Sequence, residues 1–217
     1  MSFLVSKTPT LQAVATEDGA QFAEDLKERV DAAIRTAQEQ PEVIAAVEAH
    51  TLAEAEQRKL EKAERALNQL AKQMLNRITA LREGAVEGLI NSIANEEKPD
   101  FGKITELSAS EERNRQLSRA IERLVEHRIP LARIERLRTG AHAAATRARA
   151  LENIAQERAE KVLENLREAV HDELVLPVDL SKGVSGVVLA QAAEWHNLAA
   201  QVSAEADRLE KVYSNRV

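Results

Sequence analysis

Apolar residues recur every three or four positions over most of the chain, which is the pattern of amphipathic helices. The longest run lies between Pro41 and Pro99, where there is no proline and the only glycines are Gly84 and Gly88. A helix of this span would be roughly 80 Å long, at 1.5 Å per residue. The pattern therefore predicts an elongated molecule, because such a helix is longer than a compact domain of 24.0 kDa is wide.

Capping and turn signals give the expected ends of the first two helices. Asp18 and Gln21 have the spacing of a capping pair, so a first helix should begin near Asp18 and stop near Gln40. Pro41 suits the first turn of a helix, because its missing N–H would have no partner there. The second helix should run from Pro41 to about Asn95.

A loop is expected over residues 96–107, which combine proline, glycine and charged residues. Ser108 and Glu111 match a capping box and predict the start of a third helix, which would continue to about residue 173. Pro130 should kink or interrupt this helix, because proline lacks a donor and clashes with the preceding turn.

The last helix should follow a connector over residues 174–186, which contains one proline and two glycines. Ser185 is the expected cap of this helix.

The second helix carries one main apolar stripe, at Leu60, Leu67, Ala71, Met74, Ile78, Leu81, Ala85, Leu89 and Ile93. From Leu60 to Ile93 the stripe repeats about every 3.67 residues, whereas a left-handed coiled coil requires 3.5. A nearly straight bundle helix is therefore expected. If the chain reverses near residue 101, residue 67 should oppose residue 136, and residue 54 should oppose residue 149.

These elements predict an all-α fold: an elongated antiparallel helical bundle with a four-helix head and a projecting long helical hairpin, kinked near Pro130. The head would comprise residues 18–62 and 141–213, and the hairpin residues 63–139. Residues 1–16 would form an N-terminal arm, and residues 17–217 a single elongated domain. The alanine-rich segments fall in the head, where close packing favours small side chains.

The expected hairpin has an unusually broad apolar face, because Leu75, Val86 and Ile90 form a second line beside the main stripe. A broad apolar face predicts a partner. The alternative is that the first helix covers this face. The predicted protein-interface residues are Leu75, Ile78, Leu81, Val86, Leu89, Ile90, Leu117, Ile121 and Leu124.

Composition narrows the classes of function. There is no cysteine, which excludes disulfides, thiolate metal sites and cysteine nucleophiles. No apolar run approaches the roughly 18 residues that a membrane span requires. The first residues do not have the pattern of a signal peptide, so we expect a cytoplasmic protein, alone or as part of a larger particle.

Charge is segregated along the chain. Residues 1–57 carry four basic and eleven acidic residues, whereas residues 113–149 carry ten arginines and three acids. The first interpretation is that acidic and basic helices pair within or between subunits. The second is a phosphate-binding surface, with Arg115, Arg119 and Arg123 as possible phosphate contacts on one helix face. Against it, Glu111 precedes Arg115 by four residues, which favours an ion pair, and no aromatic lies nearby to stack bases.

Catalytic and metal-binding patterns are lacking. A di-metal centre in a bundle needs two Glu-x-x-His pairs, and the chain has one, at Glu168 and His171. There is no nucleophile elbow and no glycine-rich phosphate loop. We therefore expect no enzyme activity, no catalytic residues, no cofactor, no metal and no small-molecule substrate.

The resulting expectation is a non-enzymatic structural or assembly protein acting through helix–helix contacts, as a subunit of a homo-oligomer or a larger complex. The alternative is a helical module that binds nucleic acid or a membrane surface through the arginine-rich segment of residues 113–149. Membrane binding is the less favoured of these, because no helix has a bulky aromatic face.

Overall fold

The computed structural model describes residues 17–169 and 178–215, and these form helices joined by short turns, with no strand among them. The all-α bundle predicted from the sequence is confirmed. The helices are α1 (Glu17–Gln38), α2 (Pro41–Ala94), α3 (Phe101–Arg123), a π-helix η2 (Leu124–Arg128), α4 (Ile129–Ala169) and α5 (Val178–Ser214).

The predicted ends of α1 and α2 agree with the structure to within a few residues. Two predicted starts were wrong. The third helix begins at Phe101 and not at Ser108, and the last helix begins at Val178 and not at Ser185.

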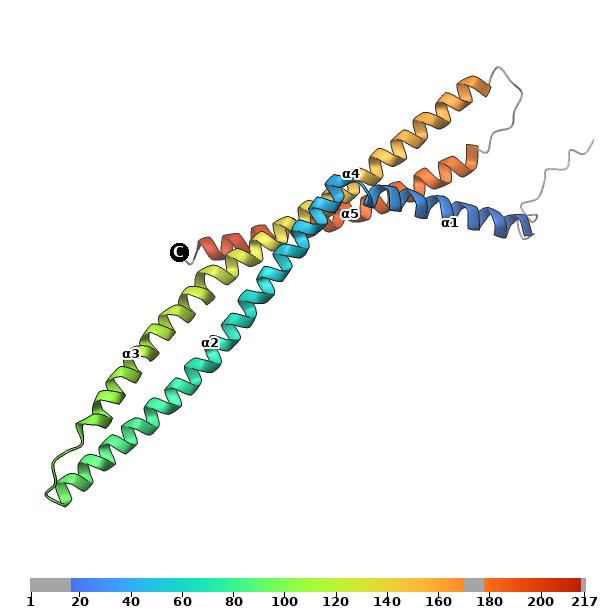
Figure 1. Ribbon diagram of the computed structural model, residues 1–217. Helices are drawn as coiled ribbons and strands as arrows, with labels where there is room; N and C mark the ends of the chain where they lie inside the picture. Colours follow the sequence, from blue (N-terminus) through green and yellow to red (C-terminus); the bar gives the residue numbers. More distant parts are fainter. Residues whose placement is uncertain (1–16, 170–177, 216–217) are drawn as a thin grey trace, which may run out of the picture. The chain divides into compact units, whose positions relative to one another are not determined.

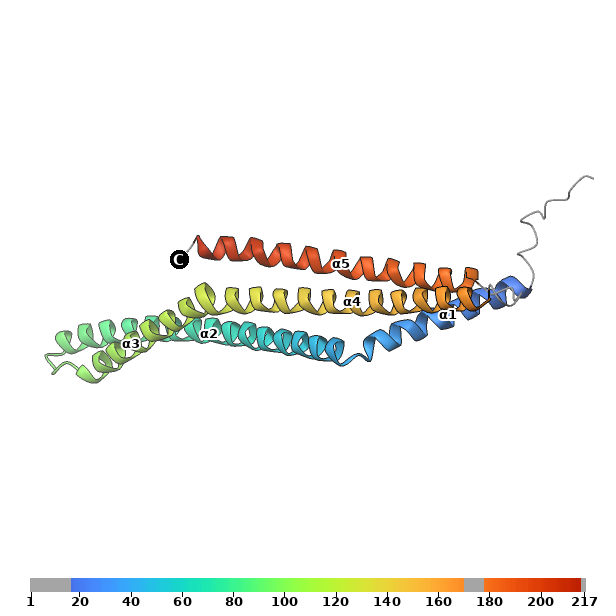
Figure 2. The same ribbon diagram turned by 90° about the horizontal axis from the view of Figure 1, so that it is seen from above.

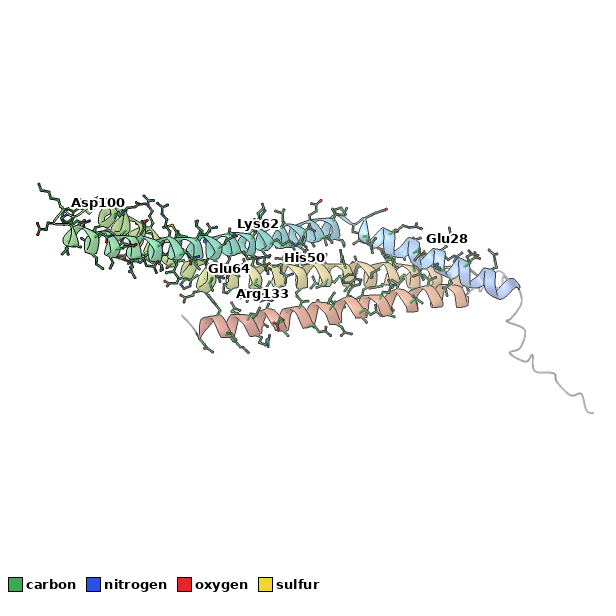
Figure 3. The ribbon with its side chains drawn as sticks, turned by 90° about the horizontal axis from the view of Figure 1, so that it is seen from below. Glu28, His50, Lys62, Glu64, Asp100 and Arg133 are labelled. Atoms are coloured by element: carbon green, nitrogen blue, oxygen red, sulfur yellow. The ribbon has the colours of Figure 1, made fainter. Side chains whose placement is uncertain are left out.

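The early start of α3 has a local cause. At the end of α2, the N–H of Glu97 donates to the carbonyl of Ser92 at 2.9 Å, and Glu96 has a positive φ of 56°, so α2 closes in a Schellman motif. Asp100 then caps α3, because its side chain accepts a hydrogen bond from the N–H of Gly102 at 2.9 Å. Figure 3 shows Asp100 at this end of the hairpin.

The described residues form two compact units, and α2, α4 and α5 contribute to both. The first unit comprises the described residues up to 48 together with those of 140–201. The second comprises residues 49–139 and the described residues from 202 onward. The expected ranges of a bundle head and a projecting hairpin stay a prediction, and the arm of residues 1–16 lies outside the described residues.

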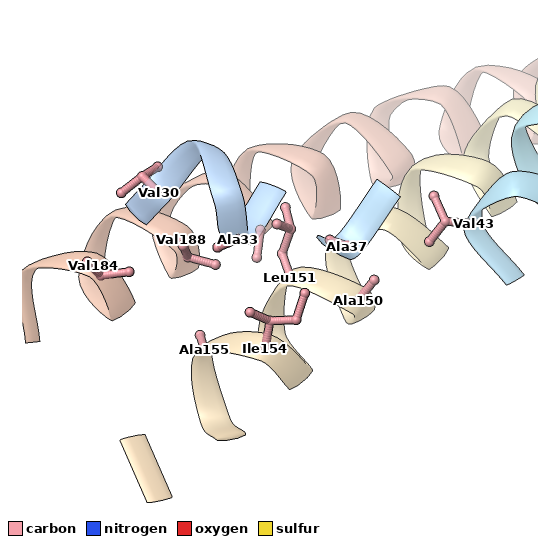
Figure 4. Packing of buried hydrophobic residues seen from close by; sticks show 11 residues of the cluster. Val30, Ala33, Ala37, Val43, Ala150, Leu151, Ile154, Ala155, Val184 and Val188 are labelled. Carbon is pink, nitrogen blue, oxygen red and sulfur yellow. The ribbon is translucent and has the colours of Figure 1, made fainter. Parts of the chain in front are cut away.

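The core of the first unit is formed by α1, α4 and α5, with one valine from the start of α2 (Figure 4). Its buried members are mostly small, which lets the helices approach closely. They are Val30, Ala33, Ala37, Val43, Ala150, Leu151, Ile154, Ala155, Val184, Val188 and Ala192.

In the second unit, α2 and α3 lie side by side and run antiparallel (Figures 1 and 2). The buried and half-buried positions of α2 alternate in steps of three and four, which we call the inner seam: His50, Ala53, Gln57, Leu60, Glu64, Leu67, Ala71, Met74, Ile78, Leu81, Ala85, Gly88 and Ser92. This is the 3.5-residue period of a coiled coil.

The predicted period of 3.67 residues was therefore wrong. It followed hydrophobicity to Leu89 and Ile93, whereas the seam continues through the small residues Gly88 and Ser92. Ile93 is 75% exposed. Beside Gly88, an added Cβ would meet only the end of the Lys103 side chain, at 3.9 Å.

The pairing of the two helices also differs from the prediction. Glu54 forms an ion pair with Arg136, at 3.5 Å between Oε1 and Nη1, and does not lie against residue 149. The physical reason is the cap at Asp100, which starts α3 several residues earlier and so moves the reversal of the chain toward α2.

The interruption expected at Pro130 takes the form of the π-helix η2, in which the N–H of Ile129 donates to the carbonyl of Leu124, five residues earlier. Before it, the seam on α3 consists of Leu107, Ser110, Asn114, Leu117, Ile121 and Leu124. Continued in register, the seam would use Arg128, Leu131, Glu135 and Arg138, but all four are exposed. The observed seam is shifted by one residue, to Ile129, Ala132, Arg136 and Thr139. The π-helix thus adds one residue to the turn, and it leaves Arg128 exposed instead of in a buried ion pair.

Candidate protein-binding surface on the helical hairpin

Four large apolar side chains lie on one side of α2 and face solvent. Leu75 is 56% exposed, Val86 57%, Ile90 60% and Ile93 75%. At 100° per residue they fall within about one third of the helix circumference, on a different side from the inner seam. We call these four residues the outer face.

The predicted interface residues divide between the outer face and the inner seam. Leu75, Val86 and Ile90 belong to the outer face, whereas Ile78 and Leu81 lie in the seam. Leu89, Leu117, Ile121 and Leu124 are half-buried, the last three of them in the seam of α3. Leu75, Val86 and Ile90 are therefore the predicted interface residues whose side chains are exposed to solvent.

The alternative in which the first helix covers these residues stays a prediction. Leu75, Val86 and Ile90 belong to the second unit, whereas Val30, Ala33 and Ala37 of α1 are buried in the core of the first unit.

Sequence reasoning missed two apolar residues at the turn end of the hairpin. Phe101 is 66% exposed and Ile104 is 37% exposed. Both were assigned to a loop because the start of α3 was placed too late. The signal that would have found them is Asp100, a good N-cap residue directly after Pro99.

Two of the polar residues on the outer face, Thr79 and Arg82, have hydrogen-bond partners inside the hairpin, whereas the exposed Glu83 lies on the same face seven residues before Ile90. The hydroxyl of Thr79 donates to the carbonyl of Leu75 at 3.1 Å. The Nε of Arg82 donates to Glu111 at 3.0 Å, and a second nitrogen of the same guanidinium bonds to the same oxygen. The polar atoms on this face are therefore already partly satisfied.

The arginine stripe on α3 is exposed, as expected. Arg115 pairs with Glu112 at 3.2 Å, and not with Glu111, which bonds to Arg82. Within residues 17–169 and 178–215, Arg119 and Arg123 form no ion pair of 4.0 Å or less. The stripe therefore contains one paired and two unpaired guanidinium groups.

Two hollows differ in size and lining. A groove of about 310 Å³ between α2 and α4 is lined by Ala49, Leu52, Ala53, Glu56, Ala132, Glu135 and Thr139. The hydroxyl of Thr139 donates to the backbone carbonyl of Glu135 at 2.6 Å. A cavity of about 20 Å³, the size of one water, lies beside Arg147, whose guanidinium sits 4.7 Å from the centroid of the Trp195 ring.

Glu205 and Arg208 shift each other's pKa. The pKa of Glu205 is lowered from 4.5, mainly because Arg208 donates a hydrogen bond to its carboxylate at 2.8 Å, and Arg133 adds to this effect. The same hydrogen bond raises the pKa of Arg208.

Among the residues that the structure describes, no three acidic or histidine side chains are grouped to hold a metal ion. His171 of the single Glu-x-x-His pair lies outside them. None of the described helical segments has the length and apolar content needed to cross a membrane.

Comparison with protein-family models, with curated proteins and with solved structures found no match to this chain. The geometry of the surface is therefore the basis for a functional argument.

Proposed function

We propose that this chain is a non-enzymatic assembly protein that binds a second copy of itself through the outer face of α2. The observation that carries the proposal is the exposure of Leu75, Val86, Ile90 and Ile93 on one side of a single helix. Scattered apolar residues are normal on a protein surface, but a line of four on one helix is typical of an interaction site.

The energies support several side chains acting together. Burying one such side chain contributes roughly 1.5–3 kcal/mol, whereas association of two proteins costs about 4–15 kcal/mol. One exposed leucine cannot offset that cost. The outer face offers four side chains from each copy, so their joint burial can offset the cost of association.

Two of the polar residues on the outer face, Thr79 and Arg82, are compatible with burial. Removing a hydroxyl or a guanidinium from water is costly unless a hydrogen-bond partner is present. Thr79 has its partner in the carbonyl of Leu75, and Arg82 has its partner in Glu111. A second copy can therefore cover both residues without leaving those donors unpaired.

Sedimentation of two matched variants tests the proposal. V86E/I90E places two charges on the outer face, and V187E/V212E places two charges at exposed valines of α5. At micromolar concentration we expect the native chain and V187E/V212E to sediment as dimers or larger species. V86E/I90E should sediment as a monomer with unchanged helical circular dichroism, because its charges would be buried without partners.

Two results would contradict the proposal. One is a native chain that is monomeric across the micromolar range. The other is dissociation of V86E/I90E and V187E/V212E to the same extent, which would show that added negative charge, and not the outer face, controls association.

A further inference from the structure

The inner seam alone does not define how α2 pairs with α3 and α4. Because its positions repeat every seven residues, sliding one helix past the other by seven residues again places seam positions opposite seam positions. Alanines at Ala53, Ala71 and Ala85 accept many different neighbours. Something other than apolar packing must therefore select the observed pairing.

The sequence contains a second start signal for α3. Asp100 caps the helix in the structure, but Ser108 and Glu111 form a capping box eight residues later. A helix capped by Ser108 would start eight residues later than α3, one residue more than a heptad. The second cap thus lies close to the start that a heptad shift of α3 requires.

We propose that three charge pairs between the helices select the observed pairing. Arg77 bonds to Glu106 at 2.6 Å, Arg82 bonds to Glu111, and Arg136 pairs with Glu54 at 3.5 Å. All three connect α2 to the returning chain, and none is found between residues of one helix.

The same residues are mismatched when the returning chain is shifted by seven residues. The residue seven positions after Glu106 is Arg113, which would meet Arg77 as a like charge. The residue seven positions after Glu111 is Ser118, and the one after Arg136 is Ala143, so Arg82 would lose Glu111 and Glu54 would lose its partner on the returning chain. Two attractions would be lost and one would become a repulsion.

The selection does not require strong ion pairs. An exposed pair contributes about 0–1 kcal/mol, but specificity depends on the difference between two states. In the shifted pairing, Arg77 is repelled and the half-buried Glu54 keeps Arg58 of its own helix but loses Arg136, so both contributions disfavour that state.

Polar seam residues increase the need for such selection. His50 and Gln57 occupy the same seam position one heptad apart, and the Nδ1 of His50 and the Oε1 of Gln57 are buried without a hydrogen-bond partner. Unpaired buried groups of this kind lower stability. Apolar packing thus favours the observed pairing less in this part of the hairpin, and the charge pairs carry the choice.

Distance measurement between two nitroxide labels tests the proposal on the full chain. The chain has no cysteine, so labels attach only at introduced positions, and Ala66 and Glu122 are exposed sites on α2 and α3. The A66C/E122C protein, diluted with an excess of unlabelled chain so that distances between copies do not contribute, should give one distance by pulsed electron paramagnetic resonance. A shift of seven residues moves the second label by about 10 Å along the helix axis, so the two pairings can be distinguished.

Charge reversal should populate the second pairing. In R77E/R82E the observed pairing becomes repulsive, whereas the shifted pairing gains an attraction to Arg113, so a second distance should appear. K62E/R65E is the matched control, because Lys62 is exposed and Arg65 pairs with Glu61 of its own helix. Adding S108A to R77E/R82E should reduce the second population, because the second cap is lost.

The full swap R77E/R82E/E106R/E111R should restore the single native distance. The proposal is overturned if R77E/R82E keeps one native distance, or if the full swap does not restore it. Should R77E/R82E lose its helical circular dichroism, the single R77E variant takes its place under the same criteria.

Discussion

Single residues decide where the chain of the hairpin reverses. Glu96 adopts a positive φ of 56°, a conformation that costs a non-glycine residue roughly 1–2 kcal/mol. The N–H groups of Glu96 and Glu97 close the end of α2, and Asp100 opens α3. This short sequence therefore sets the pairing of the second unit at the cost of one strained residue.

Replacement of Glu96 by glycine should stabilise the protein. Glycine reaches the left-handed region without the steric conflict of a Cβ, so E96G should raise the free energy of unfolding by about 1 kcal/mol, measured by urea denaturation. The control is E97G, at a neighbouring residue without positive φ, which should give no increase. An E96G protein less stable than E97G would show that this turn is not strained.

At the scale of the elements, the helices and two of their boundaries could be predicted from sequence because the signals are local. Pro41 ends one helix and starts the next whatever surrounds it. The start of α3 could not be predicted in the same way, because Asp100 and Ser108 are both good caps and the choice depends on contacts with α2.

The seam was misread past Ala85 for a different physical reason. There Gly88, Leu89 and Ser92 are all half-buried, while Ile90 and Ile93 face solvent. A hydrophobic pattern follows the apolar residues to Ile93, whereas the 3.5-residue spacing continues through Gly88 and Ser92.

The π-helix is an element whose role can be tested by deletion. Removing Glu126 and replacing Pro130 by alanine should convert η2 and its neighbours to a continuous α-helix, with the seam still in register. We expect this variant to keep at least the native melting temperature, because it also removes an interior proline. Circular dichroism on heating measures the result.

Deletion of Ser118 is the matched control for this prediction. It also removes one exposed residue, but from the α-helical part of α3. The seam residues Ile121 and Leu124 would then turn away from α2, and the melting temperature should fall by several degrees or more. Equal losses in the two deletions would contradict the role given to η2.

At the scale of the whole molecule, the sequence predicted an apolar face on the hairpin but not which of its residues a partner can reach. Burial depends on which side of α2 faces α3, and this follows from the pairing of the helices. Only the structure separates Val86 and Ile90 on the outer face from Ile78 and Leu81 in the seam.

The central claim is that the outer face of α2 is covered by a second copy of the chain. Hydroxyl-radical footprinting of the native protein tests it most directly, since it reads the exposure of individual side chains as the concentration is raised. Modification of Leu75, Val86, Ile90 and Ile93 should fall severalfold between nanomolar and micromolar protein. Modification of Val187 and Leu189, which are exposed on α5, should not change. Equal modification of the outer face at all concentrations would contradict the claim.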